Sequence, residues 1–326
     1  MALFSRRGPS DESDAAASSD AAETTPDLEV PPVEEVVPHV GISVSTFGKA
    51  ATPPPSSRPD AAPPARTQTV PGLPDNAVLK NALAALPEVP KNTDVMNVMR
   101  QALQGHLYVR VQGDAQALIA EGKGLTLAVT AIEDKRFLLA FTGGAALQDS
   151  VRADGDAATS AVGQPASTVF QNVVAGPYAG LFLDHATSGA RLILPSELIT
   201  KALEESDPTF TVKTLLVGER TDATAFQVVD ALTRVSLWVA GGTDESGRIG
   251  LAEARSADGR RRLEVFSHPL EVIALGRGDR PLPVTGAQLG KALASDPGIT
   301  GIVIDPAGPW IELGRDDLGP VLALAD

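Results

Sequence analysis

The sequence contains no cysteine, and this absence excludes disulfide bonds, thiolate nucleophiles and cysteine-bound metal sites. Aromatic residues make up only 4% of the 326 residues, so any core has to be filled mainly by Leu, Val, Ile and Ala. No apolar stretch approaches the roughly 20 residues that span a bilayer, and residues 1–7 lead into Ser, Asp and Glu instead of an apolar signal-peptide core. We therefore expect a cytoplasmic protein without membrane insertion.

Positive charge is also scarce, because 41 acidic residues face 27 Lys and Arg and give a formal net charge of −14. Sequence-independent binding to nucleic acids depends on clustered Lys and Arg, so we expect no nucleic-acid partner. One dense basic run, Arg260–Arg262, follows Asp258 and Gly259. We predict a solvated turn there, with a contact to a phosphate or an acidic partner as the alternative. The excess of Arg over Lys and the abundance of Ala indicate a bacterial coding sequence.

Motifs for metals, cofactors and covalent catalysis are missing as well. The sequence has no Walker-type phosphate loop, no dinucleotide-binding glycine fingerprint and no nucleophile elbow. Its four histidines share no ligand spacing: they are His39, His106, His185 and His268. His268 precedes Pro269, and we predict that it caps a helix that Pro269 opens. We expect no metal, no cofactor and no catalytic residue set.

What the sequence does contain is one ordered pattern written twice. A helix-like stretch leads to Leu107–Val109 in the first copy and to Leu237–Val239 in the second. Later, an alternating run ends on Phe and a hydroxyl residue in each copy, and a glycine-initiated aliphatic run ends on Asp in each copy. The same order of signals at a nearly constant separation indicates a tandem duplication that diverged by changes in loop length.

This pattern predicts the domain organisation. Residues 1–72 are rich in Pro, Ala, Ser and acidic residues and are predicted to form a disordered tail. The first copy is assigned to residues 73–206 and the second to residues 207–326. Within each copy, hairpins alternate with helices, so we predict an α+β fold with a small, mainly antiparallel sheet and flanking helices. The connection between the copies is short, and we expect them to pack as one unit.

Seven residues stand at equivalent strand ends of the two copies, where loops that leave a sheet commonly carry binding residues. A structural role, in which the Phe fills the core and the polar residue caps a turn, is the alternative. The candidate ligand-binding or partner-binding residues are Phe141, Thr142, Asp184, His185, Phe266, Ser267 and Asp305. In the tail, Thr24 and Thr25 lie in an acidic context that favours a phosphorylation switch.

At these residues the chain resembles the SseB-like family, which includes enhanced-serine-sensitivity proteins and proteins similar to the SseB N-terminal domain. Members of the family usually follow the glycine-aliphatic strand with Asn-Pro, whereas this chain has Asp184-His185 and Asp305-Pro306. The resemblance covers about 230 residues in both copies, not the tail, and implies no catalytic residue set.

From these features we expect a non-enzymatic cytoplasmic adaptor that binds another protein. The alternative is a small-ligand sensor or an enzyme that uses the groove between the two copies.

Overall fold

The computed structural model describes residues 61–243, 249–255 and 259–325. The candidate phosphorylation sites Thr24 and Thr25 and the first 60 residues of the predicted tail lie outside the described residues.

The first copy consists of helices and strands in this order: α1 (Ala77–Ala84), α2 (Asn92–Ala102), β1 (His106–Gln112), α3 (Ala115–Ala120), β2 (Val129–Ile132), β3 (Lys135–Phe141), α4 (Gly144–Asp154), β4 (Thr159–Pro165), α5 (Ala166–Ala175), β5 (Gly180–Leu183), β6 (Leu192–Pro195) and α6 (Ser196–Glu204).

The second copy follows the same order, except that the strand β8 stands where the first copy has α3 and that η1 and α11 stand where it has α6: α7 (Thr211–Val217), α8 (Thr224–Leu232), β7 (Leu237–Thr243), β8 (Ile249–Leu251), β9 (Glu253–Arg255), β10 (Arg261–Phe266), α9 (Pro269–Ala274), β11 (Arg280–Val284), α10 (Gly286–Ser295), β12 (Ile299–Ile304), β13 (Ile311–Gly314), the 3₁₀ helix η1 (Arg315–Leu318) and α11 (Gly319–Leu322).

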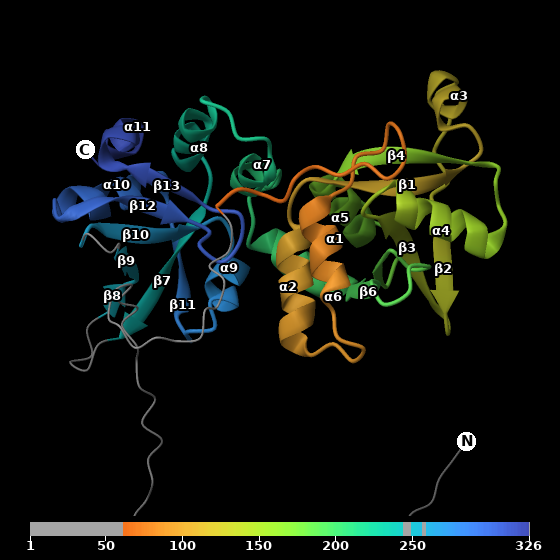
Figure 1. Cartoon of the computed structure of the whole chain (residues 1–326), viewed down its shortest axis with the longest axis horizontal. Coiled ribbons are helices and arrows are strands. Elements are labelled where there is room, and N and C mark those ends of the chain that lie inside the picture. The colour runs from red at the N-terminus through yellow and green to blue at the C-terminus, as the bar shows by residue number, and fades with distance from the viewer. Residues whose placement is uncertain (1–60, 244–248, 256–258, 326) are drawn as a thin grey trace, which may run out of the picture. The chain divides into compact units, whose positions relative to one another are not determined.

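The two sheets have the same topology. The strand order is β4-β1-β3-β5-β6 in the first copy and β11-β7-β10-β12-β13 in the second (Figure 1). In each described sheet one central pair is parallel, β3 with β5 and β10 with β12, and the other pairs are antiparallel. The predicted tandem duplication and the mainly antiparallel α+β fold are therefore confirmed.

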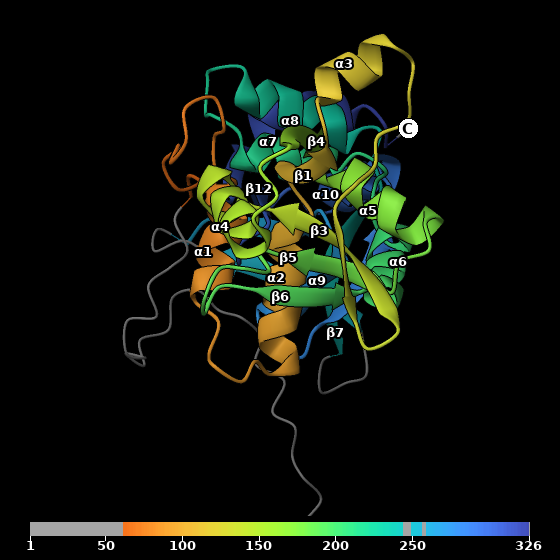
Figure 2. The ribbon, with the colours of Figure 1, turned by 90° about the vertical axis from the view of Figure 1, so that its right-hand side faces the viewer.

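Alternating residues of the central strands supply two cores on opposite faces of the first sheet. In β3, Leu138 and Ala140 join the larger core, whereas Leu139 and Phe141 join a smaller core with α4. Figure 2 shows α4 on one side of β3 and β5, and α5 and α6 on the other. The larger core of the second copy contains only Val, Leu, Ile and Ala among its buried members, as the scarcity of aromatic residues predicts.

The edge strands β4 and β11 escape the sequence analysis. In the part of the chain that the structure describes, each pairs with a single neighbour, β4 with β1 and β11 with β7. An edge strand tolerates residues that a central strand rejects, which is why β11 can contain Pro281 and Pro283 and β4 can contain Gly163 and end on Pro165. Such residues resemble loop sequence, so these strands carry no clear alternating pattern. The short helices α3 and α7 are missed too, because neither begins with a proline such as Pro269, which signals the equally short α9.

Residues 61–72, which the sequence analysis assigns to the tail, make defined contacts with both copies. The Thr67 carbonyl accepts a hydrogen bond from the Asp75 amide at 2.8 Å, and the Thr67 hydroxyl donates to the Asp75 carboxylate at 2.7 Å. Farther upstream, the Ala61 carbonyl accepts from the Trp310 amide at 3.1 Å. Hydroxyl and backbone groups therefore hold residues 61–72 against the two copies despite the proline content of this segment.

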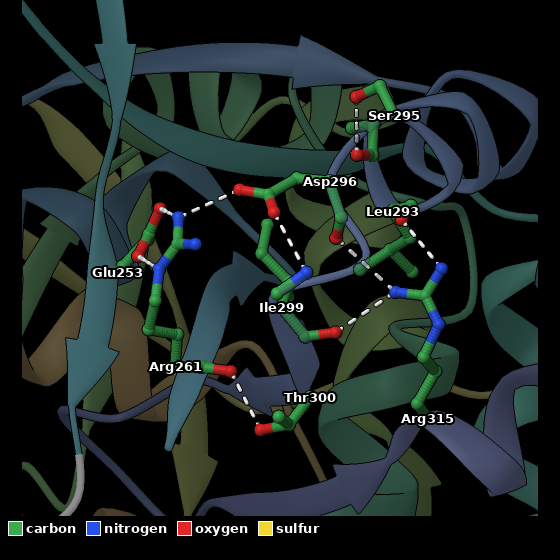
Figure 3. Close-up of polar contacts among 10 residues, drawn as sticks. Glu253, Arg261, Leu293, Ser295, Asp296, Ile299, Thr300 and Arg315 are labelled. Atoms are coloured by element: carbon green, nitrogen blue, oxygen red, sulfur yellow. Dashed lines mark hydrogen bonds and ion pairs between the residues drawn. The ribbon is translucent and has the colours of Figure 1, made fainter. Parts of the chain in front are cut away.

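The basic run at Arg260–Arg262 is largely part of a strand, not a solvated turn. Arg261 lies between the carboxylates of Glu253 and Asp296, with distances of 2.6–2.8 Å from its guanidinium nitrogens to the carboxylate oxygens (Figure 3). Arg262 forms an ion pair with Glu312 at 3.2 Å. The charges of these two arginines are therefore compensated inside the second copy.

A neighbouring arginine closes the end of α10. The Arg315 guanidinium donates hydrogen bonds at 2.9 Å to the carbonyls of Leu293 and Ile299 (Figure 3). Leu293 is in the last turn of α10, where carbonyls lack partners within the helix. This contact ties α10 to β12 and η1.

None of the helices in the described ranges is long and apolar enough to cross a membrane.

Candidate functional site

Thr142 and Asp184, two of the predicted site residues, meet where β3 and β5 end side by side. The Thr142 amide donates to Asp184 Oδ1 at 2.8 Å, and the Thr142 hydroxyl donates to Oδ2 at 2.6 Å. Asp184 has a φ of 46°, in the left-handed region that Asp and Asn tolerate better than most residues. Because β3 and β5 are parallel, their carboxyl ends lie at the same edge of the sheet, which brings these two residues together.

The second copy contains the same arrangement between β10 and β12. Asp305 has a φ of 51°, its Oδ1 accepts from the Ser267 amide at 2.8 Å, and its Oδ2 accepts from the Ser267 hydroxyl. Burial raises the pKa of Asp184 and of Asp305 to about 6 in each copy, against the hydrogen bonds that favour the ionised form. We call these two arrangements the strand-end clasps. Their repetition supports a structural role in holding the parallel strand pair.

The remaining predicted site residues surround the clasps. Phe141 and Phe266 are fully buried and belong to the small cores beneath α4 and α9. His185 is half-buried, and its ring packs edge-on against Phe141 and Phe182 at centroid distances of 6.0 and 5.9 Å. Burial, followed by the charge of Arg110, lowers the pKa of His185. Among the described residues, no hydrogen bond or ion pair joins the clasp of one copy to that of the other.

The two copies are joined instead by a buried charge cluster that the sequence analysis does not find. Glu271 in α9 accepts from Arg100 in α2 at 2.8 Å, and its other carboxylate oxygen accepts from Lys213 in α7. All three side chains are at most 8% exposed. Burial alone would raise the pKa of Glu271, but the two cations hold it below its ordinary value. We call these residues the interface cluster.

The helix that carries Glu271 begins with a second contact between the copies. His268 Nδ1 accepts from the Leu270 amide at 3.1 Å, which confirms the predicted helix cap, and His268 Nε2 lies 3.0 Å from the Ala202 carbonyl of α6. A ring that accepts at Nδ1 and donates at Nε2 is neutral. Burial lowers the pKa of His268 to about 4, in agreement with this state. Leu270 itself packs into the large core of the first copy.

The described residues line at least three cavities along the boundary between the copies. The largest of these three has a volume of about 730 Å³ and is lined by β1, the end of β4, the start of α5 and the segment Thr209–Thr214. A second, of about 280 Å³, shares His106 and Thr214 with it and extends to Arg66. The third, of about 310 Å³, lies between Arg100 and Ala307–Pro309. None of the predicted strand-end residues lines any of the three.

The residues of the interface cluster leave only a weak signal in the sequence. Lys213 and Glu271 each stand next to apolar residues that are buried, in Val212-Lys213 and in Leu270-Glu271-Val272. A charge flanked by core residues could have indicated a buried ion pair. Nothing in the sequence, however, indicates that Glu271 pairs with Arg100, which stands more than 100 residues earlier.

Comparison with known protein families gives one match, to the model of the SseB protein N-terminal domain, at residues 79–200 and 213–319. The two matched segments coincide with the two copies and together cover more than half of the chain. The chain belongs to the SseB family. It carries two SseB domains in tandem, as its resemblance to this family implies. Comparisons with curated proteins and with solved structures give no match.

Proposed function

We propose that this protein is a non-enzymatic cytoplasmic adaptor whose two SseB domains form one rigid platform for a protein partner. The main observation behind the proposal is that the polar strand-end residues of both copies hydrogen-bond to each other within the clasps and are not exposed as a catalytic group. Both carboxylates are at least 97% buried, and each accepts two hydrogen bonds from its own copy. Their hydrogen-bonding capacity supports the fold, and they line none of the cavities described above.

The interface cluster supports the rigidity that this proposal needs. A carboxylate enclosed by two cations is costly to separate, because breaking it leaves uncompensated buried charge. The contacts of Leu270 and His268 with the first copy add to this rigidity. Two domains in a fixed relation can both contribute to one binding surface without the added entropy cost of fixing them relative to each other when a partner binds.

A comparison of α2 with α8 suggests where the partner binds. Both helices precede the first strand of a sheet and end in Ala-Leu, so Asn97 of α2 corresponds to Phe226 of α8. Asn97 is exposed and polar, and it lines the cavity between the copies. Phe226 is 72% exposed. An exposed aromatic side chain at this position of α8 fits a partner that presents an apolar surface.

The test is site-specific cross-linking in the native host. A photoreactive amino acid is placed at Phe226, and at Ile119 of α3 as a matched position that is 59% exposed. The proposal predicts that a protein cross-links at position 226 but not at 119, and that Phe226→Asp removes it from affinity purifications while Ile119→Asp does not. Identical products at both positions, or no product at 226, would contradict it.

A second candidate function is the binding of a small molecule between the copies. The largest boundary cavity favours it, since its volume of about 730 Å³ lies within the usual range of ligand sites, roughly 300–1,000 Å³. Thermal unfolding of the intact chain with a panel of metabolites, including amino acids such as serine, tests this candidate. A reproducible rise of the midpoint with one compound supports it, and a panel without any shift counts against it.

Regulation through Thr24 and Thr25 stays a prediction. Phosphate on either residue would add roughly −1.5 to −2 charges and could recruit a partner with an arginine cluster. Phosphopeptide mapping of the protein from its host tests this, and unmodified peptides under all growth conditions would end the idea.

A further inference from the structure

The largest boundary cavity receives the N-terminal end of α5. Pro165 occupies the cap position of this helix and offers no side-chain acceptor, and the first turn contains no acidic residue. The first amide groups of a helix lack partners within the helix and carry a partial positive charge. Ser167 and Thr168 of this first turn line the cavity. The Ala166 amide already donates to the Gly105 carbonyl at 3.1 Å, so the open helix end consists of the Ser167 and Thr168 amides. This end faces space that is large enough for a ligand.

The corresponding helix of the second copy is closed by its own residues. α10 begins with Thr285, whose hydroxyl accepts from the Gln288 amide at 3.2 Å, and the Gln288 side chain accepts in return from the Thr285 amide at 2.9 Å. Because this capping box pairs two amide groups at the start of α10, fewer amides remain for a ligand. The open helix end is thus a feature of the first copy alone and is not required by the fold.

Ser167 provides an independent sign of a ligand. It is only 7% exposed, it lines the cavity, and its hydroxyl makes no hydrogen bond with any part of the chain that the structure describes. Its oxygen is not among the fully buried polar atoms that lack a partner, so it keeps accessible surface and is available to a ligand in the cavity. The corresponding residue of α10 is Ala287, so the domain does not need a hydroxyl at this position. A hydroxyl and the α5 amides converge on one part of the cavity.

The rest of the lining defines the chemistry of the ligand. The described lining residues include no Asp, Glu, Lys or Arg, and Tyr108, Pro165 and Phe210 supply apolar surface. Without a lysine or arginine, the cavity suits a single negative charge better than a phosphate dianion. Without a carboxylate, the ammonium group of an amino acid would find no ionic partner.

We propose that this cavity binds a small organic monocarboxylate with an apolar tail. The carboxylate accepts hydrogen bonds from the Ser167 hydroxyl and from the amides of Ser167 and Thr168, and the tail lies against Tyr108 and Phe210. This inference goes beyond the adaptor proposal and names the ligand class for the second candidate function, on which it rests.

The test is isothermal titration calorimetry of the intact chain with butyrate, hexanoate and octanoate, with hexylamine, hexanol and inorganic phosphate as comparisons. We expect the carboxylates to bind with affinity that rises with tail length, and the comparison compounds not to bind. Ser167→Ala, which copies the residue found in α10, should weaken hexanoate binding about ten-fold or more, because hydrogen bonds to charged groups are stronger than neutral ones.

Two further variants keep the result interpretable. Thr168→Glu places a carboxylate in the first turn of α5, where it favours the helix but repels the ligand, so hexanoate binding should be lost without a fall in the thermal midpoint. Ala287→Ser makes the reverse change at the capped helix and should leave binding unchanged.

No binding of any carboxylate overturns the inference, as does equal binding to wild type and Ser167→Ala, or binding of hexanol as strong as that of hexanoate. If a compound of another class shifts the midpoint in the metabolite panel while all carboxylates fail, the small-molecule function survives and this inference alone fails. Cross-linking at Phe226 reports on the adaptor proposal separately.

Discussion

The two copies share their strand-end clasps but differ at their helix ends and faces. Asp184 and Asp305 have the same backbone conformation, the same pair of hydrogen bonds and the same direction of pKa shift. By contrast, the start of α5 faces a cavity, whereas the start of the corresponding helix α10 is capped by its own residues. The start of α9 packs on the other copy, whereas the start of the corresponding helix α4 is covered by residues 67–75. The clasps, which both copies share, maintain the SseB fold. The helix starts, which differ, mark the surfaces that join the copies or are available to ligands.

The largest expected effect concerns the residue that joins the copies. Glu271→Ala should lower the free energy of unfolding by about 3–5 kcal/mol, because it leaves the charges of Arg100 and Lys213 buried without a counter-charge. Asp230→Ala, which breaks the exposed pair with Arg234, is the control and should cost less than about 1 kcal/mol. Chemical denaturation monitored by circular dichroism measures both. Equal costs would show that the interface cluster does not hold the copies together.

The clasps should contribute equally in the two copies. Asp184→Ala and Asp305→Ala each remove the acceptor of a buried amide and a buried hydroxyl, and each places Ala at a positive φ. We expect a loss of about 2–4 kcal/mol for each. Asp→Asn at the same positions keeps one acceptor and tolerates the backbone, so it should cost clearly less. A loss in only one copy would contradict a shared structural role and would renew the case for a functional site at the other.

His268 has no counterpart in the first copy, where Gly143 occupies the equivalent position, and it should make stability depend on pH. Its folded pKa of about 4 lies below the value of about 6.5 for an unperturbed histidine, so its contribution is present above pH 6.5 and is lost as the pH falls towards 4. Across this window the loss amounts to at most about 3 kcal/mol.

His268→Asn keeps an acceptor for the Leu270 amide but does not titrate. The stability advantage of wild type over His268→Asn should therefore shrink as the pH falls from 7 to 4. Taking the difference between the two proteins removes the opposite contribution of Asp184 and Asp305, whose raised pKa values make stability fall as the pH rises from about 4 to about 6. A difference that does not change with pH would contradict the buried, neutral state of His268.

The smallest expected effect concerns the predicted tail, in which residues 61–72 contact the two copies. Removal of residues 1–60 should leave the thermal midpoint nearly unchanged, whereas removal of residues 1–72 should lower the free energy of unfolding by about 1–3 kcal/mol. The second deletion removes the hydroxyls of Thr67 and Thr69 that bind the Asp75 carboxylate. Thr67→Val with Thr69→Val in the full chain should reproduce most of the loss. Identical midpoints for both deletions would restore the original boundary at Leu73.

The repeated order of segments predicted the fold, because a duplication preserves core positions such as Phe141 and Phe266 while its loops change. The hairpins β2–β3 and β5–β6 followed from alternation and turn residues, and the cap at His268 followed from Pro269. The edge strand β11 could not be predicted, because Pro281 and Pro283 are acceptable only in a strand with one free edge.

The site was less predictable than the fold. The sequence placed Thr142 and Asp184 at strand ends, but not that they bond to each other, because that depends on the parallel pairing of β3 with β5. The interface cluster and the cavity at Ser167 arise from contacts between distant segments, and single-sequence patterns do not contain them.

The central claim is that the two SseB domains form one cooperative unit. Its most direct test is scanning calorimetry of the intact chain beside two separate halves that end at Ser206 and begin at Asp207. The cut takes Phe210 and Leu270 away from the large core of the first copy and separates Glu271 from Arg100. We predict one transition for the intact chain and a much lower midpoint for each half. If each half instead melts at the midpoint of the intact chain, the contacts between the copies do not couple their stability, and the claim is wrong.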